Sequence, residues 1–177
     1  MVDMRNGKLR IRNATTDDAK LLSDWWNDGE IMAHAGYPNG IGISENKVVE
    51  LIKANNDMNR RLIIEFENRP IGEMSYRTPS EKIAEIGIKI CDASQQNKGF
   101  GSRYLKMLMK HIIMNMGYDK IILDTNLNNE RAQHVYETLG FRKVRTNIDA
   151  WKNQLGELQS SVDYEMLKEE YVRLYCK

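Results

Sequence analysis

The sequence predicts one α/β domain over residues 1–177, in which a mixed sheet carries helices on both faces. This length suits a single domain that buries a sizeable core. Segments with the period-two alternation of strands are interspersed with segments of helical period. A glycine-rich hexapeptide, Gln96–Gly101, joins one segment of each kind. The predicted order of elements is β-α-α-β-β-β-α-β-α-β-β.

The first third of the chain is expected to contain one strand and two helices. The strand covers residues 8–14, and Thr15 and Asp18 follow it with the spacing of a capping box. Turn-forming residues predict a loop over residues 36–40, and Ser44 is placed to cap the second helix. The apolar stripe of the first helix comprises Leu21, Leu22, Trp25 and Trp26.

The rest of the chain is expected to supply six strands and two helices. The long helix after Gln96–Gly101 has an apolar stripe, and a later helix is capped by Asn128 or Asn129 and ended by Gly140. Residues 147–160 show no clear period and are expected to form a long loop. The predicted strands are residues 61–66, 71–77, 82–90, 120–125, 141–145 and 162–166.

The hexapeptide Gln96–Gly101 has the properties of an anion site. Free backbone N–H groups point outward at the first turn of a helix, and the helix dipole favours negative charge there. Gly99 and Gly101 let a phosphate approach the backbone without a Cβ in the way. The spacing differs from that of the P-loop and of the three-glycine dinucleotide fingerprint. We therefore expect a phosphate-bearing cofactor at the start of the long helix.

Composition and charge narrow the classes of function. A formal net charge of +1 gives no electrostatic argument for binding nucleic acid or an anionic membrane. Two cysteines, Cys91 and Cys176, provide neither a disulfide framework nor the spacing of metal ligands, so no metal site is expected. The first residues lack the apolar core of a secretion signal, and no run approaches the ~20 apolar residues that span a bilayer. A cytoplasmic protein is expected.

Two segments together resemble the GNAT superfamily of acyl-CoA-dependent N-acetyltransferases, over residues 71–141. The first matches the family's pyrophosphate-loop pattern, Gln/Arg-x-x-Gly-x-Gly/Ala, at Gln96, Gly99 and Gly101. The second matches the family's Asn-x-x-Ala, Tyr and Gly-Phe pattern at Asn129, Ala132, Tyr136, Gly140 and Phe141. The resemblance implies the GNAT (acyl-CoA N-acyltransferase) fold, with a mostly antiparallel central sheet. The pattern is most similar to the branch that acetylates ribosomal-protein N-termini or small-molecule amines.

The resemblance also implies acetyl-CoA as the cofactor and assigns residues to it. In the family, the pantetheine arm lies between two strands that separate, so Ile88 and Ile90 would offer it main-chain groups and Asn129 would contact it. Lys98 and Arg103 could add charge-assisted contacts to phosphates, or could be ordinary solvated cations. The main-chain amides expected at the pyrophosphate are those of Asn97, Lys98, Gly99, Phe100, Gly101 and Ser102.

Acetyl transfer to a protonated amine requires a proton acceptor and a proton donor. Tyr136 matches the family's tyrosine acid, although it also belongs to an apolar stripe on its helix and could be a packed residue. For the base, Asp124 and Glu85 are rivals, Glu73 is a third carboxylate, and several family members use only ordered water. Neither cysteine has an evident activating neighbour, which favours direct attack by the amine in a ternary complex.

The sequence leaves the acceptor open between a small-molecule amine and a peptide N-terminus. His34 lies in the region that would border the acceptor, and the homodimers common in the family remain open here. The main alternative function is a non-catalytic acyl-CoA-binding sensor or interaction module, and a third is an unrelated α/β nucleotide-binding protein. The presence of Tyr136 and a nearby carboxylate favours the enzyme. Acidic residues that would suit a cationic acceptor are Asp24, Asp28, Glu30, Glu73 and Asp124.

Overall fold

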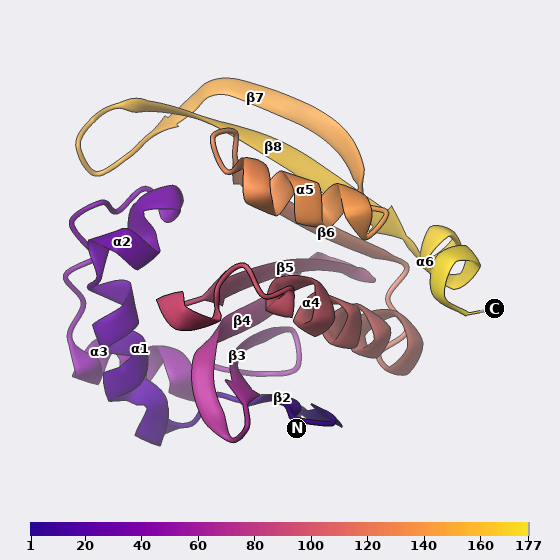
Figure 1. Ribbon diagram of the computed structural model, residues 1–177, viewed down its shortest axis with the longest axis horizontal. Helices are drawn as coiled ribbons and strands as arrows, with labels where there is room; N and C mark the ends of the chain where they lie inside the picture. Colours follow the sequence, from indigo (N-terminus) through magenta and orange to yellow (C-terminus); the bar gives the residue numbers. More distant parts are fainter. Residues whose placement is uncertain (177) are drawn as a thin grey trace.

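The structure, a computed structural model, describes residues 1–176 and contains one eight-stranded sheet (Figure 1). The strands are β1 Asp3–Asn6, β2 Leu9–Asn13, β3 Asn59–Phe66, β4 Arg69–Ser80, β5 Ile83–Ile90, β6 Lys120–Asn126, β7 Arg142–Lys152 and β8 Leu158–Leu167. They lie in the order β1-β2-β3-β4-β5-β6-β8-β7. Every neighbouring pair is antiparallel except β5 and β6, which are parallel. The mixed, mostly antiparallel sheet of the prediction is thereby confirmed.

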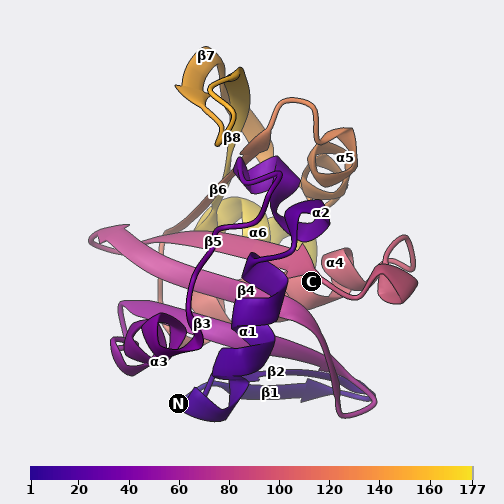
Figure 2. The same ribbon diagram turned by 90° about the vertical axis from the view of Figure 1, so that its left-hand side faces the viewer.

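Helices cover both faces of this sheet. They are α1 Ala19–Trp26, α2 Gly29–Met32, α3 Glu45–Lys53, α4 Phe100–Lys110, α5 Glu130–Thr138 and α6 Lys168–Tyr175, with a π-helical turn, His111–Asn115, extending α4. A smaller apolar core joins α1 and α3 to Ile63 of β3, and a larger one joins α4 and α5 to the central strands. Figure 1 separates the α1–α3 group on the left from α4 and α5, and Figure 2 shows α1 in front of the central strands.

The predicted helix starts are confirmed by their capping contacts. Thr15 and Asp18 form the capping box ahead of α1. The Ser44 hydroxyl accepts a hydrogen bond from the Lys47 N–H at 3.3 Å, and the Asn129 side chain accepts one from the Ala132 N–H at 3.2 Å. Each contact satisfies a backbone donor that a helix start leaves without an intrahelical partner.

The strands β5 and β6 separate part of the way along their length. They pair over three positions only, and the last pair is Glu85 with Ile122. Beyond it β5 continues to Ile90 and β6 to Asn126 without pairing to each other. The Gln96 side chain donates a hydrogen bond to the Ile90 carbonyl at 3.0 Å, and so occupies part of the edge that β6 leaves. The sheet therefore contains a gap at its centre.

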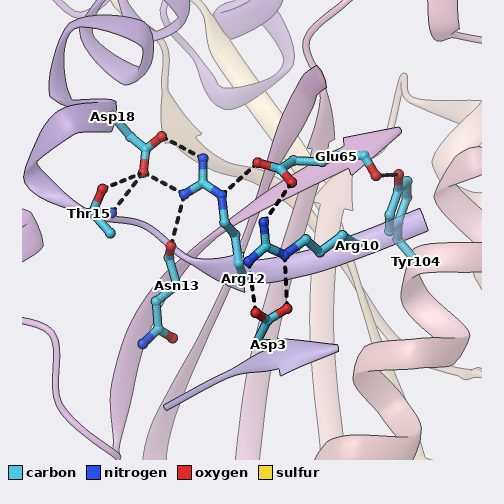
Figure 3. A network of polar contacts seen from close by, with 8 residues as sticks. All are labelled: Asp3, Arg10, Arg12, Asn13, Thr15, Asp18, Glu65 and Tyr104. Carbon is cyan, nitrogen blue, oxygen red and sulfur yellow. Dashed lines mark hydrogen bonds and ion pairs between the residues drawn. The ribbon is translucent and has the colours of Figure 1, made fainter. Parts of the chain in front are cut away.

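A network of ion pairs connects the two helical layers through β2 and β3 (Figure 3). The buried Glu65 carboxylate accepts hydrogen bonds from Arg12 at 2.7 Å and from Arg10 at 3.3 Å, and Arg12 also binds Asp18 at 2.7 Å. Burial opposes ionisation of Asp18, but the bonds from Arg12 and from Thr15 hold its pKa below the usual range. On the opposite face, the Tyr104 hydroxyl of α4 donates to the Glu65 main-chain carbonyl at 2.6 Å.

The expected loop over residues 147–160 is wrong, because most of it is a β-hairpin. β7 runs to Lys152 and β8 begins at Leu158, so only residues 153–157 form the turn. β7 is an edge strand whose side chains are almost all exposed, and its pairing with β8 shifts register twice. An exposed, irregular strand has no period-two apolar pattern for the sequence to display.

Three short elements also escaped prediction. β1 and α2 have four residues each, and α6 has eight. Four residues span too few turns or alternations to give a clear period. α6 is as long as α1, but it buries only Tyr171 and exposes Val172 and Leu174, so it has no apolar stripe. Among the described residues, no helix combines the length and apolar character needed to cross a bilayer.

Candidate active site

A cleft of about 1060 Å³ opens where β5 and β6 separate. At one end, which we call the α4 end, it is lined by the Gln96–Gly101 loop and the start of α4 and α5. At the other, the α2 end, it is lined by α2 and the residues after it, by Trp151 of β7 and by Ser161 of β8. The exposed edges of β5 and β6 form the middle. The lining includes α5, which packs on one face of the sheet, and α2, which packs on the other.

The α4 end has the backbone geometry of an anion site. Gly99 caps α4 in the left-handed region at φ 75°, and Asn97 adopts φ 60° just before it. A Cβ added to Gly99 or to Gly101 would meet nothing within 4 Å, so the space beside both glycines is open. Free N–H groups at the first turn of α4 therefore border unfilled space, which is compatible with the anion site that the sequence predicts.

Three cations surround this loop and form no ion pair within residues 1–176. The Arg131 guanidinium donates to the Asn97 side-chain oxygen at 3.1 Å and to that of Gln96 at 3.4 Å. The Lys98 ammonium donates to the Gln95 side chain at 3.4 Å, and the Arg103 guanidinium lies 5.7 Å from the centre of the Phe100 ring. Three uncompensated positive charges beside free amides fit a ligand with several phosphate charges.

Sequence reasoning missed Arg131 because the residue belongs to another helix. Arg131 lies on α5, and only the packing of α5 beside α4 brings it to the loop. Its neighbour Asn129 lines the cleft as expected, while its side chain caps α5. The Phe100 ring is buried against Phe66, at 4.7 Å between ring centres, so only the main chain of Phe100 is placed to meet a ligand.

The open edge of β5 presents main-chain groups to the cleft. The Cys91 N–H donates to the Ile71 carbonyl across the β4–β5 pair at 2.8 Å. Because hydrogen bonding alternates along an antiparallel pair, the N–H and C=O groups of Ile88 and Ile90 point away from β4. They point to the side from which β6 has departed, and both residues line the cleft. A ligand with amide groups could therefore bind along this edge like an added strand.

Tyr136 of α5 lies at the middle of the cleft. Its ring is buried, with centres 6.1 Å from the Phe141 ring and 5.6 Å from the Tyr164 ring. Within the described chain its hydroxyl has no hydrogen-bond partner. Burial, with a smaller contribution from the nearby Asp124 carboxylate, raises the pKa of Tyr136 to about 12. The packed-residue interpretation accounts for the ring but not for a free hydroxyl at the cleft.

Asp124 of β6 reaches the same cleft from the other face of the sheet. Its neighbours Leu123 and Thr125 are buried, and the side chains of a strand alternate between faces. Asp124 faces the solvent in the cleft, yet protein surrounds its other sides. Its burial among protein atoms, followed by repulsion from Glu85 and Asp163, raises the pKa of Asp124. It forms no ion pair with any described residue.

The two rival carboxylates are both engaged. Glu85 lines the cleft but pairs with Arg77 at 2.8 Å. The buried Glu73 accepts a hydrogen bond from the Trp26 ring N–H at 2.7 Å and lies 3.6 Å from the Lys89 ammonium. Asp124 is therefore the free carboxylate of the three.

Of the other residues that the sequence singled out, His34 lines the α2 end, whose lining also includes Trp151. Trp26 belongs to the core under α1. Cys91 is buried, which raises the pKa of its thiol, and Cys176 is exposed in the last turn of the described chain. No group of three or more potential metal ligands occurs in the part of the chain that the structure describes.

The raised pKa of Asp124 predicts that Asp124→Asn stabilises the protein near pH 7. A carboxyl whose pKa is higher in the folded state binds its proton more tightly there, so stability declines as pH rises from the unfolded pKa, about 3.9, through the folded value. At pH values above that window, the ionised Asp124 carboxylate destabilises the folded state, and the uncharged amide of the variant removes this destabilisation. The expected gain in melting temperature should therefore appear at pH 7 and vanish below about pH 4.

A control for this measurement is Glu81→Gln, at an exposed carboxylate in the β4–β5 turn. This substitution removes one negative charge without changing the cleft. An equal gain in both variants would mean that net charge, rather than the surroundings of Asp124, accounts for the effect.

Comparison with known proteins agrees with this arrangement. Residues 8–142 match the family model of the acetyltransferase (GNAT) domain. A spermidine N-acetyltransferase from Vibrio cholerae, solved with CoA and spermine, superimposes with a TM-score of 0.84 at 21% identity, covering 94% of this chain and 99% of that one. The ribosomal L7/L12 alpha-N-protein acetyltransferase RimL, solved with coenzyme A, gives a TM-score of 0.84 at 18% identity, covering 96% and 99%.

A GNAT-family acetyltransferase from Bacillus anthracis is similar as well, with a TM-score of 0.80 at 21% identity over 96% of this chain and 100% of that one. At these identities the structures establish the fold, while the family model covers most of the sequence. The open glycine loop, its three cations and the free edge of β5 fit the phosphates and amides of coenzyme A. The chain thus belongs to the GNAT family and is an acetyl-CoA-dependent N-acetyltransferase.

Proposed function

We propose that the protein transfers the acetyl group directly to a primary amine in a ternary complex, with Asp124 as general base and Tyr136 as general acid. The observation that carries this proposal is that both side chains reach one cleft from opposite faces of the sheet. Each has a raised pKa, and the Asp124 carboxylate contributes to that of Tyr136. A base and an acid on either side of a reacting centre can serve the incoming amine and the departing sulfur.

Asp124 acts on the acceptor. An alkyl ammonium has a pKa of about 10, so the acceptor arrives protonated and must lose a proton before it can attack. A raised pKa makes the Asp124 carboxylate a stronger base than an ordinary aspartate. Glu85 already forms an ion pair with Arg77, and Glu73 already accepts a hydrogen bond from Trp26. Asp124 has no such partner among the described residues and is free to accept the proton.

Tyr136 acts on the leaving group. With a pKa of about 12 its hydroxyl stays protonated at neutral pH and can donate to sulfur. When bound, acetyl-CoA supplies a thioester whose acetyl carbon is open to attack by the amine. Direct attack needs no enzyme nucleophile, and the buried Cys91 thiol with its raised pKa is poorly suited to be one.

The cofactor is expected along the whole α4 side of the cleft. The amides of residues 97–102, with Lys98, Arg103 and Arg131, would hold the phosphates. The main chain of Ile88 and Ile90 and the side chain of Asn129 would hold the pantetheine arm. This assignment leaves the α2 end of the cleft for the acceptor.

The charges in the middle and at the α2 end of the cleft favour a small cationic amine. Glu30 and Asp124 both line the cleft and form no ion pair with other residues of the described chain. The similar enzymes are named for spermidine and for a ribosomal protein N-terminus, so their names cover both a polyamine and a peptide. Two unpaired carboxylates suit a molecule with more than one positive charge, which distinguishes a diamine or polyamine from a peptide with a single free amine.

Acetyl-CoA-dependent thiol release against a panel of amines tests the proposed function. The panel contains diamines and polyamines, aminoglycosides, amino acids and peptides, with a reaction that lacks acceptor as the control. We expect release that depends on a small amine with at least two positive charges. No release with any acceptor, while acetyl-CoA still raises the melting temperature, would instead indicate the non-catalytic acyl-CoA-binding module.

Replacing Tyr136 by phenylalanine should lower kcat by about tenfold or more, because general acid catalysis contributes roughly 10²- to 10⁴-fold. The ring packing against Phe141 and Tyr164 is retained, so the melting temperature should change little. Steady-state kinetics over a range of pH measure the effect. An unchanged kcat at every pH would assign Tyr136 to packing alone.

Replacing Arg131 by alanine should weaken coenzyme A binding by roughly tenfold or more, since a hydrogen bond to a charged group contributes about 1.5–3 kcal/mol. Calorimetric titration with coenzyme A and with 3′-dephospho-coenzyme A identifies which phosphate Arg131 contacts. If the variant loses the same affinity for both ligands, Arg131 contacts the pyrophosphate. If it loses affinity for coenzyme A alone, Arg131 contacts the 3′-phosphate. The exposed Arg69, at the β3–β4 turn, gives the matched variant Arg69→Ala, which should bind like the wild type.

A further inference from the structure

We propose that a contact between the β7–β8 hairpin and the loop after α2 sets the width of the acceptor site, so that the enzyme prefers unbranched amines. This hairpin–loop contact consists of Trp151 and Gln154 on one side and residues 36–40 on the other. It rests on the function proposed above, because it concerns the acceptor of that reaction. Figure 1 shows the turn of the β7–β8 hairpin reaching towards α2.

Gln154 makes most of the contact. Its side-chain oxygen accepts from the Asn39 N–H at 3.0 Å, and its side-chain nitrogen donates to the Gly40 carbonyl at 2.9 Å. Its main-chain N–H donates to the Gly36 carbonyl at 2.8 Å. One residue thus uses three polar groups to join segments more than a hundred residues apart in the sequence.

Trp151 completes the contact by lying directly against the Gly36 backbone. Gly36 has φ 93°, and a Cβ placed on it would come within 2.3 Å of the Trp151 ring. A side chain at position 36 would therefore displace the ring. Trp151 also lines the cleft together with His34 and Ala35, so it forms part of the wall at the α2 end.

The loop beneath the contact has little freedom to move. Gly40 has φ 76°, and a Cβ there would lie 2.1 Å from the Asn27 carbonyl oxygen. A Cβ on Gly29 would lie 2.0 Å from the Pro38 carbonyl oxygen. This close packing fixes the loop against α1 and α2.

The hairpin turn is held internally as well. The Asn153 side-chain oxygen accepts from the N–H groups of Leu155 and Glu157, both at 3.0 Å. The Asn153 N–H donates to the Glu157 carbonyl at 3.0 Å. The hairpin turn and the loop over residues 36–40 are each held by internal contacts, and Gln154 joins them. The Trp151 side chain at the α2 end therefore has little freedom to move.

The hairpin–loop contact therefore sets the width of the α2 end. On this proposal, an unbranched amine passes the Trp151 side chain on its way to Asp124, whereas a ring on the acceptor would have to displace the hairpin. Displacement breaks the three hydrogen bonds of Gln154. Gln154 is accordingly a positioning residue, and Trp151 is the side chain that meets the acceptor.

The test compares two acceptors that carry two primary ammonium groups at the ends of a six-carbon path and differ in width, 1,6-diaminohexane and 1,4-bis(aminomethyl)cyclohexane. The wild type should acetylate the unbranched amine with much the higher kcat/KM. In Gln154→Ala the ratio of kcat/KM for the unbranched diamine to that for the cyclohexane diamine should fall by about tenfold, because two side-chain hydrogen bonds are lost. Amide hydrogen exchange at residues 150–158 should become faster, and the Kd for coenzyme A should stay the same.

Two further variants separate the contact from general destabilisation. Leu155→Ala, at an exposed position of the same turn, keeps every bond of Gln154 and should behave like the wild type. Trp151→Ala keeps the Gln154 side-chain bonds but removes the ring, and should narrow the ratio in the same way. The Trp151 variant also provides a result if Gln154→Ala does not fold.

An unchanged ratio of kcat/KM values in both Gln154→Ala and Trp151→Ala would overturn the inference, whether or not hairpin exchange becomes faster. A wild type that uses the cyclohexane diamine as well as diaminohexane would overturn it too. A wild type inactive with diaminohexane but active with other amines would refute the stated preference alone. Inactivity with every amine would remove the proposed function, and this inference with it.

Discussion

The parting of β5 and β6 is the feature on which the rest of the molecule depends. Two parallel strands begin with normal pairing and stop after Glu85 and Ile122, although each continues for several residues. An unpaired strand edge inside a sheet is costly unless other donors and acceptors satisfy it. Gln96 supplies part of the compensation through the Ile90 carbonyl, and a ligand with amide groups can supply more.

The gap also explains the division of charge along the cleft. Within residues 1–176, free amides and three cations without ion pairs gather at the α4 end, which is the proposed site of the cofactor phosphates, while Asp124 in the middle and Glu30 at the α2 end also form no ion pair. Uncompensated charges of like sign in a cleft reduce stability, and such sites are typically functional. Glu65 and Asp18 provide the contrast, because their arginine partners join β2, β3 and the start of α1 into a structural network (Figure 3).

Local patterns in the sequence were sufficient to predict the helices and strands that have a regular apolar period and the loop at the start of α4. Capping residues such as Ser44 and Asn129 act on N–H groups within one helical turn, so spacing alone reveals them. Most buried strands and the helices α1, α3, α4 and α5 were predicted for the same reason. The β7–β8 hairpin was predicted only in part, as strands 141–145 and 162–166, because the exposed remainder of an edge strand with shifted register has no apolar alternation. α2 was too short to show a period, and α6 buries only Tyr171 and so has no apolar stripe.

The sequence by itself determined the α/β class, the glycine loop, Tyr136 and a short set of candidate carboxylates. Only the tertiary structure decided that Arg77 engages Glu85 and Trp26 engages Glu73, which leaves Asp124 free. The tertiary structure also decided that Arg131 lies beside the Gln96–Gly101 loop and that Gln154, in the hairpin turn, bonds to residues 39 and 40. The physical reason is that caps, turns and periodicity arise from neighbours in the chain. Ion pairing, burial and the pKa shifts they cause depend instead on side chains brought together by packing across the sheet.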